Sequence, residues 1–281
     1  MIKSILLSTD GSEHAWAAWQ YALDIAKAFD AWLRVLSVVD VRALRDHTIA
    51  TMGGLYPTEP LEPSSPLELE EKLESEQNRL LEEVRSRTQA AGVKVKVSLA
   101  RGTPSGTILS YEPFVDMIAM GHRGHRSKWE VFFLGSVAEE VLQRAAKPVL
   151  MSPARYEPIQ RILAAYDASD PSQRALHWAA ELAATMSLPL DVVHVNRDRA
   201  VGHTLLREAD EYLRPYDTIP HVGTILREGK PALQILAVAA ERGAGLIVMG
   251  AHGHSRVREA LLGSTTEEVL RQADKPLLMT R

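Results

Sequence analysis

The chain of 281 residues contains no cysteine, which excludes disulfide bonds, thiolate metal sites and cysteine nucleophiles together. It also has no apolar run near the roughly 20 residues that a membrane-spanning helix needs, and residues 1–7 lack the apolar core of a signal peptide. The net charge of −4 is not the basic excess typical of nucleic-acid-binding proteins. We therefore expect a water-soluble, cytoplasmic protein that binds neither nucleic acid nor a membrane.

Signatures of several enzyme classes are missing as well. The sequence has no Gly-x4-Gly-Lys-Ser/Thr motif of P-loop NTPases and no Gly-x-Ser-x-Gly elbow of serine hydrolases. Two loop segments each contain a pair of histidines, His122 with His125 and His252 with His254, but no pair of carboxylates lies near them in the sequence. We therefore expect no metal site at either pair.

What the sequence does contain is an internal repeat, and its length suits two domains of roughly 100–200 residues each. The segments that align are residues 5–12 with 162–169, 33–38 with 190–195, 135–136 with 263–264, and 147–151 with 275–279. A repeat this long indicates a duplicated domain rather than a solenoid. The sequence predicts one domain at residues 1–152 and a second at 159–281, with a linker at 152–158 between them.

Within each copy, short β-branched runs alternate with helical patterns, which is typical of a parallel sheet covered by helices. Strands are expected in the first copy at residues 5–9, 34–39, 93–99, 115–120 and 148–151, and helices at 15–29, 67–91, 103–113 and 136–146. Near-continuous apolar runs such as 246–249 indicate strands buried on both faces. The predicted fold class is α/β, with two tandem doubly wound domains that carry helices on both faces of their sheets.

A proline-rich insertion at about residues 40–66 interrupts the first copy, at the carboxyl end of its second strand. Loops at this position in an α/β domain often carry function. The insertion is therefore either a tolerated surface excursion or a lid over a ligand site, and the sequence leaves both open.

Ligands of open parallel sheets bind beyond the carboxyl ends of the strands, where the strand order reverses. Asp10 and Asp167 directly follow the first strand of each copy. A carboxylate there can accept hydrogen bonds from ribose hydroxyls, or it can cap the following helix. Val38 and Val195 end the second strand, where main-chain groups can read an adenine edge, although taken alone each is more simply explained as a core valine.

Glycines follow the fourth strand of the second copy in a spaced pattern. Gly250 and Gly253 precede nine further residues, and Gly263 with Ser264 and Thr265 then opens a helix. Glycine lets main-chain amides approach a phosphate closely, and a helix start supplies free N–H groups and the positive end of the dipole. The alternative is a loop followed by an ordinary helix cap.

The first copy repeats this pattern at the same place. Gly121 and Gly124 precede ten residues, and Gly135 with Ser136 and Val137 then opens the corresponding helix. Because the pattern recurs in both copies, we favour a phosphate site over a chance loop. The additional residue and the bulky, basic loop of the first copy lead us to rank the site of the second copy first.

Both halves resemble universal stress protein domains, and the whole chain resembles a tandem member of that family. The ATP-binding members carry a Gly-x2-Gly-x9-Gly-Ser/Thr pattern, which falls on Gly250, Gly253, Gly263 and Ser264, and with one additional residue on the glycines of the first copy. The family's strand-one aspartate corresponds to Asp10 and Asp167. Its strand-two adenine contact corresponds to Val38 and Val195.

The resemblance implies a five-stranded sheet of order 3-2-1-4-5 in each half, of the adenine nucleotide alpha hydrolase-like type. It implies ATP, with or without Mg²⁺, across the reversal between strands one and four. It also implies an intramolecular pseudo-dimer that pairs residues 149–151 with 277–279, while a further homodimer stays open.

We therefore expect an ATP-binding regulatory stress protein with at most slow ATPase activity. The alternatives are a nucleotide-free protein-interaction module and an ATP-dependent adenylating enzyme.

Overall fold

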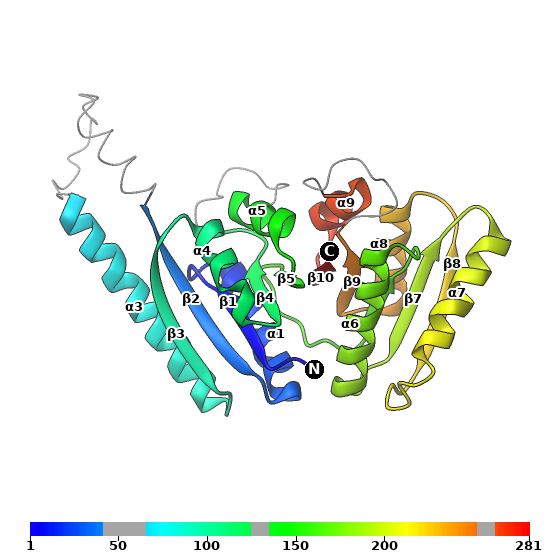
Figure 1. Ribbon diagram of the computed structural model, residues 1–281, viewed down its shortest axis with the longest axis horizontal. Coiled ribbons are helices and arrows are strands. Elements are labelled where there is room, and N and C mark those ends of the chain that lie inside the picture. The colour runs from blue at the N-terminus through cyan, green and yellow to red at the C-terminus, as the bar shows by residue number, and fades with distance from the viewer. Residues whose placement is uncertain (42–65, 125–134, 252–261) are drawn as a thin grey trace, which may run out of the picture.

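The computed structural model describes residues 1–41, 66–124, 135–251 and 262–281 (Figure 1). The strands of the first half are β1 (Ser4–Ser8), β2 (Trp32–Asp40), β3 (Val95–Gly102), β4 (Met117–Gly121) and β5 (Val149–Ser152). Its helices are α1 (Glu13–Phe29), α3 (Pro66–Ala90), α4 (Pro104–Tyr111) and α5 (Ser136–Arg144), with a 3-10 turn, η1, at Glu112–Phe114. The predicted insertion at 40–66 lies almost entirely outside the described residues.

The second half repeats this order of elements. Its strands are β6 (Ile162–Ala165), β7 (Leu190–Val195), β8 (Val222–Arg227), β9 (Leu246–Gly250) and β10 (Leu277–Thr280). Its helices are α6 (Asp170–Met186), α7 (Arg199–Leu213), α8 (Pro231–Arg242) and α9 (Ser264–Gln272). Each half therefore alternates strands with helices, as the sequence predicts.

All of these strands form one ten-stranded sheet in the order β3-β2-β1-β4-β5-β10-β9-β6-β7-β8. Within each half the strands are parallel and follow the order 3-2-1-4-5, which confirms the predicted topology. The strand order reverses between β1 and β4 in one half and between β6 and β9 in the other. Ligand sites of doubly wound sheets lie at such points.

The two halves meet where β5 and β10 pair antiparallel at the centre of the sheet (Figure 1). Leu278 lies opposite Leu150, and Leu277 and Met279 lie opposite Met151 and Val149. This pairing of 149–151 with 277–279 is the predicted pseudo-dimer contact. One sheet thus runs through both domains without an interruption.

Helices cover both faces of the sheet, and each face has its own apolar core. One core packs α1, α3, α6 and α7 against the sheet, and the other packs α4, α5, α8 and α9. Both cores contain buried residues from the two halves, including Leu150 and Leu278 on one face and Met151 and Leu277 on the other. The halves are therefore held together by continuous packing as well as by strand pairing.

The segment that joins the halves is tied to both of them. The main-chain N–H of Glu157 donates to the Tyr21 hydroxyl at 3.0 Å, and the Tyr156 hydroxyl donates to Asp24 at 2.5 Å. The Tyr21 and Tyr156 rings pack in a tilted arrangement, with centroids 4.8 Å apart and planes at 55°. Lys275 reaches the Glu157 carboxylate at 2.7 Å. The linker thus connects α1 of the first half to the start of β10.

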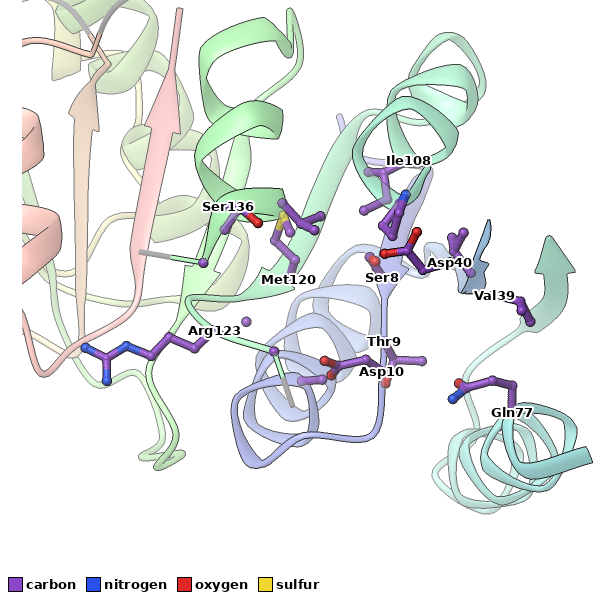
Figure 2. Close-up of a pocket in the computed structure, with 18 of the residues that line it drawn as sticks. Ser8, Thr9, Asp10, Val39, Asp40, Gln77, Ile108, Met120, Arg123 and Ser136 are labelled. Carbon is purple, nitrogen blue, oxygen red and sulfur yellow. The ribbon is translucent and has the colours of Figure 1, made fainter. Parts of the chain in front are cut away.

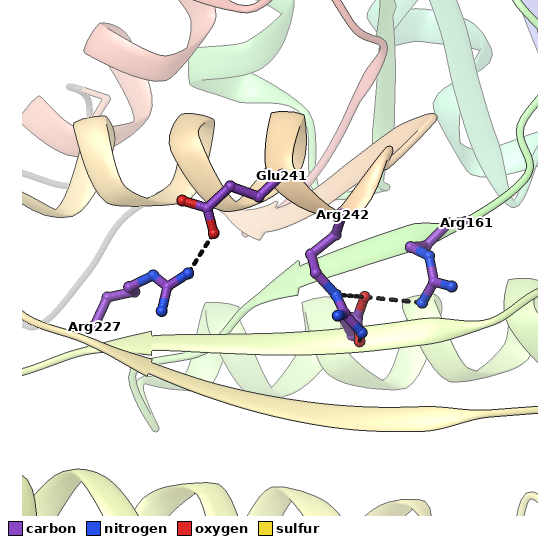
Figure 3. A network of polar contacts seen from close by, with 5 residues as sticks. Arg161, Arg227, Glu241 and Arg242 are labelled. Carbon is purple, nitrogen blue, oxygen red and sulfur yellow. Dashed lines mark hydrogen bonds and ion pairs between the residues drawn. The ribbon is translucent and has the colours of Figure 1, made fainter.

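A buried carboxylate marks the start of β7 in the second half. Arg161 and Arg242 approach Asp191 from two sides, with Arg161 Nη1 at 2.9 Å and Arg242 Nε at 3.0 Å from Oδ2 (Figure 3). Gly223 lies beside Asp191 in the sheet, where a Cβ atom would collide with the carboxylate. Burial alone would raise the pKa of Asp191, but the bonds from Arg242 and Arg161 outweigh it and hold that pKa below its usual value.

Some element boundaries differ from the prediction for identifiable reasons. Helix α1 begins at Glu13 rather than Ala15, because the Ser12 hydroxyl caps it by accepting from Ala15 N at 3.2 Å. Strand β3 continues to Gly102 rather than residue 99, because β2 offers it partners as far as Asp40. Among the described helices, we find none long and apolar enough to cross a membrane.

Candidate functional site

A cavity of about 740 Å³ lies at the carboxyl ends of β1, β2 and β4 in the first half (Figure 2). Its walls come from these strand ends, from α3 and α4, and from the start of α5. The cavity is therefore at the strand-order reversal, where a doubly wound sheet binds its ligand. The predicted residues that line it are Asp10, Val38, Gly121, Gly124, Gly135, Ser136 and Val137.

Asp10 belongs to a tight turn between β1 and α1. Its Oδ1 accepts a hydrogen bond from Ser12 N at 3.0 Å, and Gly11 between them has a φ of 80°, which suits glycine. The carboxylate therefore does serve the turn, which was the structural alternative for this residue. It also lines the cavity. The two roles are compatible, because a carboxylate has two oxygens and about four acceptor sites.

Gly124 brings the loop after β4 close to Asp10. A Cβ atom at position 124 would lie 2.5 Å from Asp10 Oδ2, so only glycine fits while the carboxylate keeps its place. The two motifs that the sequence identified 114 residues apart thus meet in one wall of the cavity.

Gly121 has a packing role that the sequence did not reveal. A Cβ atom there would lie 2.6 Å from His14 Cβ and 3.0 Å from Ala15 N. Gly250 has the same role in the second half, where a Cβ atom would lie 2.8 Å from Pro171 Cβ. The first glycine of each motif is the last residue of its strand, β4 or β9. Because it has no side chain, that strand end can pack against the first turn of α1 or α6.

Helix α5 starts at the cavity with no side chain on its capping residue. Its N-cap is Gly135, with φ −64° and ψ 141°, and α9 of the second half starts in the same way at Gly263. Helices α1 and α6 differ, because their N-caps are Ser12 and Ser169 and both side chains accept a main-chain N–H. The first-turn N–H groups of α5 can therefore bind an anion in the cavity, assisted by the helix dipole.

His122 and Arg123 lie between the two glycines of the first copy, and both line the cavity. His122 is buried, and its main-chain N–H donates to Ser152 O at 2.9 Å. Its side-chain Nε2 has no hydrogen-bond partner among the residues that the structure describes. Burial, followed by the nearby His14 and Arg123, lowers the pKa of His122 to about 3, so the imidazole is neutral. Figure 2 shows the Arg123 side chain extending away from Asp10.

Helix α3 forms a cavity wall that sequence reasoning missed. Leu73, Glu76 and Gln77 all line the cavity, and the Ser37 hydroxyl of β2 donates to Gln77 Oε1 at 2.5 Å. The available signal was Ser37 itself, a polar residue within the apolar run of residues 35–39. It did not point to a helix 40 residues further along the chain.

The second half places its candidates in corresponding positions. Asp167 follows β6 and accepts from Ser169 N at 3.0 Å, Val195 ends β7, and Ser264 and Thr265 begin α9. Gly253 lies outside the described residues. Among those described in either half, no group of three or more His, Asp or Glu side chains could hold a metal ion.

Two bulkier side chains distinguish the second half near these positions. Tyr166 stands where the first half has Thr9, and His194 stands where it has Ser37. Both are buried, and His194 Nδ1 donates to the Tyr166 carbonyl at 2.7 Å, while its Nε2 has no partner within the described part of the chain. These side chains occupy the side of β6 and β7 that faces α7.

Comparison with known proteins agrees with this architecture. The model of the universal stress protein family matches residues 1–153 and 158–281. A universal stress protein of Synechocystis sp. is 30% identical over 289 aligned residues, covering 100% of both chains. One from Methanocaldococcus jannaschii is 34% identical over 153 residues, covering 54% of this chain and 82% of that protein. The crystal structure of a universal stress protein from Archaeoglobus fulgidus has a TM-score of 0.77 at 28% identity, covering 99% of this chain and 98% of its own. The chain therefore belongs to the universal stress protein family and carries two of its domains in tandem.

Proposed function

We propose that the cavity of the first domain binds an adenine nucleotide, ATP in particular. The observation that carries this proposal is the open start of α5, which lies in one cavity with the Asp10 carboxylate. Main-chain N–H groups favour a phosphate, and a carboxylate accepts hydrogen bonds from ribose hydroxyls. A cavity of about 740 Å³ is within the usual range for small-molecule sites.

The roles follow from the chemistry of each wall. Phosphates rest on the first turn of α5, at Gly135, Ser136 and Val137, and on the loop at Gly124. The ribose contacts Asp10, and the adenine lies at the end of β2 near Val38. Any Mg²⁺ bound with the triphosphate takes its ligands from phosphate oxygens and water, since the described residues offer no cluster of metal-binding side chains.

A second nucleotide site belongs to the corresponding positions of the second domain. Asp167, Val195, Gly250, Gly263, Ser264 and Thr265 support it, and Gly253 completes the motif. The ranking of this site above the first stays a prediction, because residues 252–261 are not described. Tyr166 and His194 favour the nucleotide-free alternative for this domain alone, since they are bulkier than Thr9 and Ser37.

The biological role that fits these sites is regulatory. Helix α5 begins at the cavity and packs in a core that continues into the second half. If α5 has two arrangements, nucleotide binding shifts the equilibrium between them by as much as the affinity for the nucleotide differs between the two. A partner-binding surface that includes α5 would change with it.

The test begins with the purified full chain. Acid treatment should release a small molecule that absorbs near the adenine maximum, or the emptied protein should bind added ATP in a calorimetric titration. The absence of both would contradict the proposal and leave a protein-interaction module. ATP-dependent release of pyrophosphate would instead indicate an adenylating enzyme.

A further inference from the structure

Helix α3 is a fixed wall of the first-domain cavity. Arg101 of β3 pairs with Glu70 of α3 at 2.8 Å and with Glu74 at 2.5 Å. Near the other end of the helix, Trp19 Nε1 donates to Thr88 Oγ1 at 2.9 Å. Contacts at both ends thus hold α3 against β3 and α1, so its cavity-facing side chains have defined positions.

Gln77 is the residue of this wall whose polar group has a set orientation. Its Oε1 accepts the Ser37 hydroxyl at 2.5 Å, and Gln77 makes no other hydrogen bond with the described residues. The side chain is half-buried and lines the cavity. Because Oε1 is held by Ser37, the two Nε2 hydrogens remain as donors at the cavity.

The position of Gln77 matches the nucleoside part of the proposed ligand. Figure 2 shows Gln77 projecting from α3 toward Thr9 and Asp10, with Val39 close to it and Ser136 at the far side of the cavity. The α5 start, which suits phosphates, therefore lies away from Gln77. The side chain faces the region assigned to ribose and base.

We infer that Gln77 is a nucleoside-binding residue of the first domain, whose Nε2 donates a hydrogen bond to an acceptor atom of the bound base or ribose. This inference rests on the proposed function. The second domain lacks the arrangement, because His194 occupies the place of Ser37 and its Nδ1 bonds the Tyr166 carbonyl. The two domains consequently differ in how they hold the nucleoside.

Three variants test the inference, each in a full chain that also carries Gly263→Leu, so that only the first domain binds. Gln77→Met keeps the length of the side chain and removes the donors. Ser37→Ala removes the anchor and keeps the amide. Asn78→Leu is the matched control, because Asn78 is the next residue of α3 and is exposed on its outer side.

Calorimetry should show the Kd for ATP rising about three- to tenfold in Gln77→Met, which is the usual net value of one hydrogen bond. The Kd should rise less in Ser37→Ala and stay unchanged in Asn78→Leu. If Gln77→Met does not fold, Gln77→Glu replaces it, since glutamate still accepts from Ser37 but donates nothing.

Two outcomes would overturn the inference alone. One is a Kd in Gln77→Met that stays within twofold of the Kd of the parent chain. The other is an equal rise of the Kd in Gln77→Met and Ser37→Ala, which would mean that Gln77 only links α3 to β2 and does not contact the nucleoside. If the chain without any substitution binds no ATP, the proposed function fails and the inference fails with it. ATP binding that vanishes in the Gly263→Leu parent would also overturn it.

Discussion

The two halves of the chain share one topology but differ in the few side chains that shape the carboxyl ends of their strands. The first half has Thr9 and Ser37 where the second has Tyr166 and His194. Thr9 lines the first-domain cavity, which reaches Gln77 of α3. Strand order therefore fixes where a site lies, while the side chains at the strand ends differ between the two halves.

The halves also differ in charge at the opposite ends of their strands. In the first half Arg34 donates to the Ser4 hydroxyl at 3.0 Å. The equivalent residues of the second half are Asp191 and Arg161, where the buried Asp191 carboxylate pairs with the partly exposed Arg161 and Arg242. The same strand position thus carries a cation, Arg34, in the first half and an anion, Asp191, in the second. In the second half this requires two arginines and the absence of a side chain at Gly223.

The largest effect on stability is expected from breaking this buried pair. Asp191→Asn should lower the free energy of unfolding by about 2–3 kcal/mol, because it removes the charge of a buried carboxylate that accepts hydrogen bonds from two arginines. Chemical denaturation of the purified chain measures it. Asp30→Asn is the matched control, since the Asp30–Lys94 pair is exposed and should cost less than about 1 kcal/mol. Equal losses in the two variants would show that burial does not strengthen the Asp191 pair.

A pH-dependent effect should distinguish His122 from its counterpart Ala251. The unfolded chain takes up a proton near the ordinary pKa of 6.5, but the folded chain does so only near 3. The unfolded state therefore binds more protons in this window, and stability should fall as the pH drops, by about 2 kcal/mol between pH 7 and pH 5.

Denaturation of His122→Ala at both pH values tests this expectation. Between pH 7 and pH 5, the free energy of unfolding should fall by about 2 kcal/mol less in the variant than in the unaltered chain. His203→Ala, which removes an exposed histidine, is the matched control for the substitution itself. An unchanged slope in His122→Ala would contradict the assignment of the pH effect to His122.

A smaller effect is expected at the turn after the first strand of each half. Gly11 and Ala168 occupy the same position and both have positive φ, 80° and 65° respectively. Alanine is strained there and glycine is not. Ala168→Gly should therefore raise the free energy of unfolding by about 0.5–1 kcal/mol, and Gly11→Ala should lower it by about 1 kcal/mol. Changes of the same sign in both variants would mean that the two turns are not equivalent.

The sequence alone was sufficient to predict the duplicated fold. The alternation of strands and helices, and the gathering of Asp10, Gly124 and Gly135 at one edge, follow from local patterns repeated in two copies. The strand order and the pairing of 149–151 with 277–279 came instead from the resemblance to the universal stress protein family. The alternation and the gathering depend on periodicity and on the position of residues relative to strand ends, which a sequence displays directly.

Other features depend on side-chain contacts between distant segments, and the sequence did not reveal them. The α3 wall at Gln77, the packing of Gly121 on His14, the burial of His122 and the ion pair of Asp191 are of this kind. Each partner is an ordinary residue in its own segment. Its role appears only when the fold brings the second segment to it.

The most direct test of the central claim, that the first-domain cavity binds a nucleotide, is a calorimetric titration of ATP into the unaltered chain and into Gly135→Leu. Among the described residues, the nearest atom to a Cβ at position 135 would be His122 O at 3.4 Å, and φ is −64°, so the backbone of the helix start accepts a Cβ atom. The leucine then occupies the place of the phosphates. We predict that the variant binds one ATP fewer per chain while its thermal unfolding temperature stays unchanged. Equal stoichiometry and affinity in the two proteins would contradict the account.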